Sequence, residues 1–431
     1  MVHPGPSRKL RRELRGAFRE ERRTRAGPVP ALFFRPSRMP TRMSDIEIPD
    51  RLVDDIIAGD CVAFVGAGFT APVLPEWRQL LVDLAAETDQ ATAEGVRRFV
   101  ESGTNRDLGA AAQTLRDRLG DDYFFHLMEE RLADPPINDV MRRRLRLLHG
   151  IPFRAILTTN FDEVLPGELP NRDAFLAVLR PEAHRWWDHR FWDEDAPGAT
   201  VVKLHGSIRT PGEVVFTHRD YRRLYASPAY ATFLRSVMTS TTVLYLGFSF
   251  GDAYLNELRS EILALLDHRG GDVPVAYAVV NDPTPVEVDY SLEHEGIHVL
   301  PVDTAGGSDF SGFDEYLDAI HDRTNPRRIL ARLIRGRRVR WVGPDHPSLA
   351  YLEAAARDQG AEIVRGDPTG DDDLVIVHGD ADDLTRLGGA PEIVLDTSPG
   401  DGRRLQAARR GAAGYAADWG ELLQEIHRLL A

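Results

Sequence analysis

The sequence predicts an α/β protein built on a Rossmann-like parallel sheet, followed by a small flavodoxin-like α/β domain. Five apolar runs have the continuous texture of strands buried on both faces. They lie at 61–68, 154–160, 200–206, 242–249 and 275–282. Each ends in glycine, asparagine, histidine or serine, which is typical of parallel strands whose carboxyl ends face a ligand cleft. From residue 337 strand and helix patterns alternate, which predicts a second, doubly wound sheet.

Composition narrows the class of protein. Hydrophobic residues make up 42% of the 431 residues and charged residues 28%, as in a globular protein. No apolar run approaches the roughly 20 residues that cross a membrane, so we expect no membrane partner. The single cysteine, Cys61, excludes a disulfide framework and a cysteine-based zinc site. We therefore expect a cytoplasmic protein that needs no metal.

Charge is divided unevenly along the chain. Residues 1–42 carry 12 basic side chains against 3 glutamates, whereas the remaining 389 residues hold 41 basic and 64 acidic ones. Such an acidic body is a poor nucleic-acid binder, so we expect it to make no direct nucleic-acid contact. The basic head is interpreted as a nucleic-acid-binding arm, an organellar presequence, or a stretch preceding the natural start at Met43. The third reading is favoured, with disorder or loose helix expected in each case.

The predicted domains are 43–334 and 336–431. Helical spacing dominates about 74–150, which indicates a helical insertion between the first two strands. A smaller insert at 166–199 contains the run HRWWDHRFW, whose histidines are interpreted as packing residues rather than metal ligands. A linker near 322–336 ends the first domain.

The first motif is FVGAGFTAP, which follows the first strand. Gly66 and Gly68 allow the backbone to turn sharply and bring amide groups close to a phosphate. Many α/β folds carry such glycines for packing alone, and that alternative stays open.

The second motif, TTNFD, places Asn160 and Asp162 at a strand end. An amide and a carboxylate there can bind a ribose and a carboxamide. Capping of the following segment by either side chain is the alternative.

The third motif, KLHGS, contains Lys203 and His205. Lysine is almost absent from the chain, with Lys9 the only other one, so Lys203 indicates a position that arginine cannot fill, unless it is chance. We expect Lys203 to bond a neighbouring backbone group or carboxylate. His205 supplies a group that titrates near neutral pH and suits acid–base work. Two further strand ends add GFSFGD, with Gly247 and Ser249, and VVND, with Asn281.

In this order the motifs resemble the sirtuin family, whose members cleave NAD, over about residues 50–305. The resemblance implies Asn160 and His205 as catalytic residues, with Asp162 facing the nicotinamide ribose and carboxamide. It further implies NAD contacts at Gly66, Ala67, Gly68 and Thr70 around the pyrophosphate, Gly247 and Ser249 at the adenosine half, and Asn281 at its outer edge.

Departures from the protein-deacylating sirtuins redirect the expected activity. Residues 206–242 hold no cysteine, so the zinc module is missing, and APVLPEWRQLL replaces the usual arginine-bearing run. GAGF, PxWxxLL, TTNFD, KLHG and GFSFGD together resemble the sirtuin-like NADases of bacterial and archaeal antiviral defence. The resemblance implies NAD+ as substrate and water as acceptor.

Residues 336–431 resemble a response-regulator receiver domain, above all in the closing run ARRGAAGYAADWGELLQEIHRLL. The phosphorylation chemistry of that family is missing. His378 stands where the acceptor aspartate belongs, and Asp418 where the lysine belongs. We expect a pseudo-receiver that serves interaction or regulation.

The sequence therefore favours an NAD+ glycohydrolase that depletes NAD+ in antiphage defence. The alternatives are a non-catalytic NAD- or ADP-ribose-binding module and a mono-ADP-ribosyltransferase. A constitutive hydrolase would kill its own cell, so we expect restraint from a homo-oligomer or from a protein activator or repressor, such as an ATP-driven DNA translocase.

Overall fold

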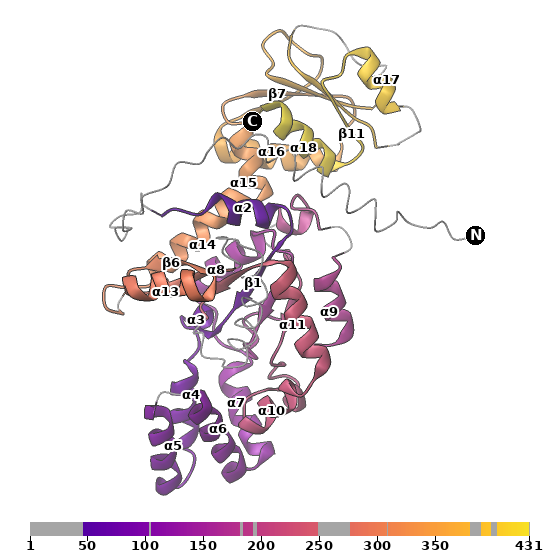
Figure 1. The fold of residues 1–431 in the computed structure, drawn as a ribbon. Coiled ribbons are helices and arrows are strands. Elements are labelled where there is room, and N and C mark those ends of the chain that lie inside the picture. The colour runs from indigo at the N-terminus through magenta and orange to yellow at the C-terminus, as the bar shows by residue number, and fades with distance from the viewer. Residues whose placement is uncertain are drawn as a thin grey trace, which may run out of the picture. The chain divides into compact units, whose positions relative to one another are not determined.

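The computed structural model describes residues 46–102, 105–181, 184–192, 196–248, 276–307, 309–379, 389–397 and 403–430. The expectations for the basic residues 1–42 fall outside this part of the chain, as does the one for Ser249. Figure 1 shows the arrangement of the helices and strands. Within the described residues, every helix is too short or too polar to cross a membrane.

The first sheet has six parallel strands in the order β3-β2-β1-β4-β5-β6, which is the Rossmann order. Its strands are β1 (Cys61–Val65), β2 (Ile156–Thr158), β3 (Val201–Lys203), β4 (Thr242–Leu246), β5 (Ala276–Asn281) and β6 (Ile297–Val302). The first five lie within the predicted runs. The sequence prediction missed β6, because His298 and Pro301 interrupt its apolar pattern. Proline is tolerated there because β6 is an edge strand.

The central strand β1 alternates between two apolar cores, which is why all five of its residues are buried. Ala63 and Val65 belong to the core under α2 (Asp50–Ile57), α8 (Asp139–Gly150) and α14 (Ser311–Thr324). Val62 and Phe64 belong to the opposite core, with α9 (Arg172–Leu179) and α11 (Pro228–Ser240). Successive strand side chains point to opposite faces, so a continuous apolar run is the expected pattern for a sheet covered on both sides.

The chain between β1 and β2 is helical, as the sequence predicts. After the short α3 (Ala67–Thr70) come α4 (Trp77–Ala85), α5 (Gln90–Ser102), α6 (Asn105–Leu119), α7 (Asp121–Leu132) and α8. In Figure 1, α2 and the helices α4 to α7 lie at opposite ends of the part of the chain that is built on the first sheet. The last helix, α8, shares the apolar core of β1, and its Leu148 is fully buried there.

The second sheet has five parallel strands in the order β11-β10-β9-β7-β8. They are β7 (Arg338–Val342), β8 (Glu362–Arg365), β9 (Leu374–His378), β10 (Glu392–Leu395) and β11 (Gly414–Ala416), with α16 (Pro347–Gln359), α17 (Arg403–Arg410) and α18 (Trp419–Leu430) around them. Counted from β7, this is the 2-1-3-4-5 order of doubly wound folds such as flavodoxin. The fold class agrees with the prediction, while a specific likeness to receiver domains stays a prediction.

The two sheets are joined by helix rather than by an irregular linker. The predicted linker 322–336 consists mainly of the end of α14 and of α15 (Pro326–Leu333). Leu330, Ala331 and Ile334 lie in the core of the second sheet. The domain boundary at 334–336 stays a prediction.

The aromatic run of the smaller insert packs on that second core. Trp192 is buried, and its ring lies 5.1 Å from Tyr351 and 5.2 Å from Trp419, edge to face in both cases. Trp187 lies against Gly420, and Arg185 pairs with Asp418 at 3.2 Å. The tryptophans of this run therefore pack on the second core, whereas the interpretation of its histidines stays a prediction.

Candidate functional site

Four loops at the carboxyl ends of β1, β2, β3 and β4 form the candidate site. In the order β3-β2-β1-β4, the chain reverses its direction of winding between β1 and β4. Open α/β sheets bind ligands in the crevice at such a switch point. The sequence-predicted residues from Gly66 to Gly247 all lie on these four loops.

Two glycine loops meet closely across the switch point. The Gly68 amide donates to the Gly247 carbonyl at 2.9 Å. A Cβ on Gly66 would lie 2.6 Å from the same carbonyl, and one on Gly247 would lie 2.2 Å from the Phe69 nitrogen. Gly247 also has a φ of +61°, which favours glycine. Packing therefore accounts for these glycines without a ligand, and their contact with a pyrophosphate stays a prediction.

Asn160 joins the loop after β2 to the loop after β1. Its side chain is buried, and its Nδ2 lies 3.3 Å from the Gly66 carbonyl and 3.4 Å from Thr70 Oγ1. The backbone N–H of Asn160 donates to Thr158 Oγ1 at 3.0 Å, and that hydroxyl in turn donates to the Val65 carbonyl. These contacts reach across to another strand, so Asn160 is not a helix cap. Ala67, the neighbour of Gly66, begins α3.

Asp162 makes a local turn contact and is buried. Its Oδ1 accepts from the Val164 amide at 3.0 Å, which is the local role named as the alternative. Burial raises the pKa of its carboxyl to about 6, and the nearby Lys203 ammonium lowers that pKa only in part. The site thus holds a carboxyl that changes charge just below neutral pH.

Lys203 braces the loop that carries Asn160 and Asp162. Its Nζ donates to the carbonyl oxygens of Asp162 and of Leu165, the latter at 3.2 Å. It also lies 3.6 Å from Glu163 Oε1, which accepts from Ser207 Oγ. The side chain is fully enclosed, and burial lowers its pKa. The expected bonding of Lys203 to backbone and carboxylate is confirmed.

His205 follows Lys203 at the carboxyl end of β3 and is only 3% exposed. Its ring packs edge to face on Tyr221 of α10 (His218–Tyr225), with centroids 5.4 Å apart. The backbone turns sharply after it, because Gly206 has a φ of +80° and a Cβ there would lie 2.1 Å from the Glu213 carbonyl. A fixed backbone and one aromatic wall therefore hold the imidazole in place.

Arg144 is a residue of the site region that the sequence analysis missed. This buried side chain of α8 donates to the Phe69 carbonyl at 2.9 Å, just before Thr70. It also binds Asp314 of α14 through Nε at 2.5 Å, and its guanidinium lies 4.7 Å from the Phe313 ring centre. No local pattern marks it, since 170 residues separate Arg144 from Asp314.

The two remaining predicted residues are Asn281, at the edge of this cluster, and Ser249. Asn281 is exposed at the carboxyl end of β5, one strand further out than β4. Ser249 lies outside the described residues. Among the residues that the structure describes, no three His, Cys, Asp or Glu side chains are grouped to hold a metal ion.

Comparison with known proteins finds a similarity in this region. Residues 154–300 match the family model described as a SIR2-like domain. The match begins just before β2 and ends in β6, so it spans Asn160, Asp162, His205 and Gly247. The first sheet is thus a Rossmann-ordered sheet with a region similar to SIR2-like domains.

Particular relatives carry the name of an NAD-cleaving enzyme. The NAD(+) hydrolase ThsA of Acinetobacter baumannii (strain 532279) is 26% identical over 219 residues, covering 49% of this chain and 41% of the relative. The NAD(+) hydrolase ThsA of Enterococcus faecium is 25% identical over 224 residues, covering 49% and 42%. The uncharacterized protein y4cA of Sinorhizobium fredii (strain NBRC 101917 / NGR234) is 28% identical over 222 residues, covering 48% and 18%. The chain spans less than half the length of these curated relatives.

Replacing Lys203 tests whether its hydrogen bonds to the loop after β2 stabilise the protein. Lys203→Met removes the donor that serves two buried carbonyl oxygens and should lower the free energy of unfolding by about 3 kcal/mol. Lys203→Arg should not restore stability, because a planar guanidinium exceeds the enclosed space. Urea unfolding followed by tryptophan fluorescence measures both.

Arg209→Met is the control for that pair of variants. Arg209 is 46% exposed, pairs with the surface acids Glu129 and Asp134, and donates to the Ala133 carbonyl at 3.4 Å, so its loss should change stability by at most about 1 kcal/mol. Full stability of Lys203→Arg would show that the position does not require an ammonium.

Asp162→Asn tests the buried carboxyl. The folded-state pKa of about 6 lies above that of an unfolded aspartate, so the folded protein binds the extra proton. Stability should therefore fall as the pH rises from 4 to 6, by on the order of 2–3 kcal/mol. The variant keeps the Oδ1 acceptor but lacks this loss, so its advantage over the wild type should grow across that range and then level off. Urea midpoints from pH 4 to 8 measure the difference, and a pH-independent difference contradicts the assignment.

Proposed function

We propose that this protein is an NAD+ glycohydrolase, which cleaves NAD+ with water to nicotinamide and ADP-ribose. The observation that carries the proposal is the position of Asn160 and His205. They lie at the carboxyl ends of the neighbouring strands β2 and β3, beside the switch point where β1 and β4 present their glycine loops. The region similar to SIR2-like domains and the hydrolase names of two relatives support this assignment.

In the proposed reaction, Asn160 orients the nicotinamide ribose and the attacking water, and His205 accepts a proton. Water adds to C1′ while the bond from C1′ to the nicotinamide nitrogen breaks. Nicotinamide leaves as a neutral base with the bonding electrons, and the proton of the water passes to the imidazole. The transition state resembles the oxocarbenium ion of other glycoside hydrolyses, so orientation of the sugar accounts for much of the rate.

Access to the site is restricted in this arrangement. Asn160, on the loop after β2, is 7% exposed, and His205, on the loop after β3, is 3% exposed. We propose that the site opens before NAD+ binds. An enzyme closed in this way would be held inactive until a partner, a second copy of the chain or another signal opens it.

Single substitutions test the assignment in the full chain. His205→Ala and Asn160→Ala should each lower nicotinamide release at least 100-fold, because each removes a group that acts in the transition state. Chromatography of NAD+, nicotinamide and ADP-ribose measures the rate, and thermal unfolding verifies that each variant folds.

The matched control is His126→Ala, since the side chain of His126 is 62% exposed and lies on the remote helix α7. Wild-type turnover by His205→Ala would overturn the catalytic assignment. NAD+ binding without turnover by any form would favour the binding module, and ADP-ribose attached to protein would favour the transferase.

We further propose that the cleavage serves antiphage defence by depleting NAD+. In bacteria that express the chain, phage infection should lower cellular NAD+ and reduce plaque numbers at least tenfold. Expression of His205→Ala should abolish both effects. Equal plaque numbers with and without the wild-type chain, at verified expression and across several phages, would reject this role.

A further inference from the structure

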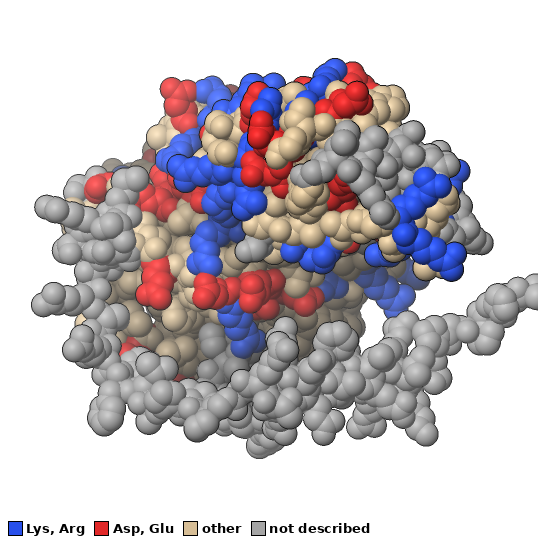
Figure 2. Space-filling view, turned by 90° about the horizontal axis from the view of Figure 1, so that it is seen from above, with Lys and Arg blue, Asp and Glu red and all other residues tan. Residues whose placement is uncertain are grey.

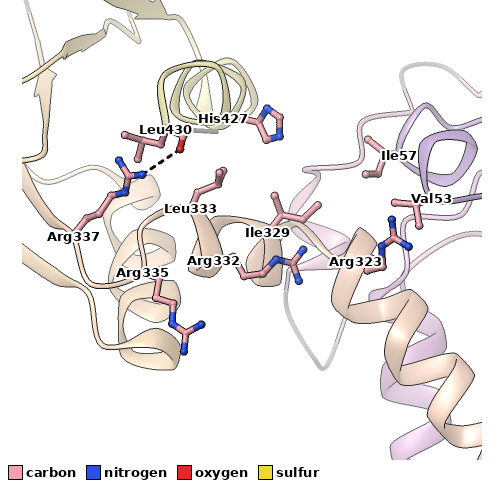
Figure 3. Close-up of a pocket in the computed structure, with 10 residues that line it drawn as sticks. All are labelled: Val53, Ile57, Arg323, Ile329, Arg332, Leu333, Arg335, Arg337, His427 and Leu430. Atoms are coloured by element: carbon pink, nitrogen blue, oxygen red, sulfur yellow. Dashed lines mark hydrogen bonds between the residues drawn. The ribbon is translucent and has the colours of Figure 1, made fainter. Parts of the chain in front are cut away.

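One cavity of the structure shares no lining residue with the candidate site and has no part in the proposed reaction. It has a volume of about 580 Å³, within the usual range of small-molecule pockets. Its walls come from α2, the end of α14, α15, the turn before β7, and α18. Figure 3 shows Val53 and Ile57 of α2 across the cavity from Leu333 and Leu430.

The lining combines basic side chains with aliphatic ones and holds no acid. Five of the ten lining residues are aliphatic, and the others are Arg323, Arg332, Arg335, Arg337 and His427. This composition is unusual in a body where acidic residues outnumber basic ones by 64 to 41. Figure 2 shows Lys and Arg mixed with Asp and Glu over one face of the molecule.

Two of the four arginines are already paired with carboxylates. Arg323 binds Asp50 and the Ile48 carbonyl, each at 2.6 Å. Arg332 binds the carboxylate and the carbonyl of Asp322, each at 2.6 Å. These two side chains shape the cavity, and their charge is largely balanced.

Among the described residues, the other two arginines have no carboxylate partner. Arg337 donates to the Leu430 carbonyl at 3.2 Å, a neutral acceptor that is drawn in Figure 3. The side chain of Arg335 has no acceptor in the part of the chain that the structure describes. The two flank Gly336, whose φ of +64° turns the chain so that both side chains line the same cavity. Each of these two guanidinium groups can therefore bind an anion that enters the cavity.

We propose that this cavity binds a small molecule that carries a polyphosphate and an apolar portion, such as a nucleotide. Arg335 and Arg337 hold the phosphate oxygens, because the planar guanidinium matches phosphate geometry. The aliphatic residues of α2, α15 and α18 contact the apolar portion. An anion without such a portion would leave that half of the lining unused.

Binding to the full chain tests the proposal, with ATP and inorganic pyrophosphate as probes in EDTA. Isothermal titration calorimetry should show ATP binding that weakens as salt rises, and weaker binding of pyrophosphate. The double variant R335Q/R337Q should bind ATP at least tenfold more weakly. Both side chains reach the cavity from the solvent-accessible turn, so the variant should fold, and thermal unfolding without ligand verifies this.

R357Q provides the matched control, since Arg357 is an exposed arginine of α16 outside the cavity lining. Its ATP affinity should stay within twofold of the wild type. Absence of ATP binding at 1 mM overturns the proposal, and so does equal affinity of the wild type and the double variant. Equal binding of pyrophosphate and ATP contradicts the role of the aliphatic residues. None of these results depends on NAD+ cleavage.

Discussion

One enclosed ammonium group holds the candidate site together. Lys203 offers three hydrogens on a compact head, and three oxygen acceptors surround it: two carbonyl groups and one carboxylate. Through them the end of β3 is tied to the loop after β2, so the strand end that carries His205 and the loop that carries Asn160 keep one relative position. In a chain that otherwise uses arginine almost throughout, this lysine is fully enclosed, and a larger, planar guanidinium is predicted not to fit there.

The remaining frame of the site comes from backbone contact and a buried ion pair. The loops after β1 and β4 approach until only glycine fits, and Arg144 fixes the outer side of the first loop through the Phe69 carbonyl. Arg144 also binds α14, which continues into the helix that enters the second core. The loop after β1 is therefore connected through packed helices to the second sheet's part of the chain.

Much of this frame follows from the sequence, because its signals are local. Continuous apolar runs revealed β1 to β5, and small residues after them marked the functional edge. The strand β6 was missed because Pro301 and His298 break its pattern. Arg144 was missed because its structural role depends on Asp314, which is distant in the chain.

The spacing of the glycines alone did not show whether they serve packing or contact a phosphate. The hydrogen bond between Gly68 and Gly247 shows that the two loops approach closely enough for packing to require glycine. The arginine cavity is likewise assembled from distant segments.

The burial of Trp192 affects how the chain can be divided. This tryptophan belongs by sequence to the first sheet's part of the chain, yet its neighbours Tyr351 and Trp419 belong to the second. Leu330 and Ile334 are shared in the same way. A fragment cut near residue 336 would expose these side chains to water as one apolar surface and would tend to associate with itself. Self-association of such a fragment in solution would then reflect the cut, and would say little about how the intact chain assembles.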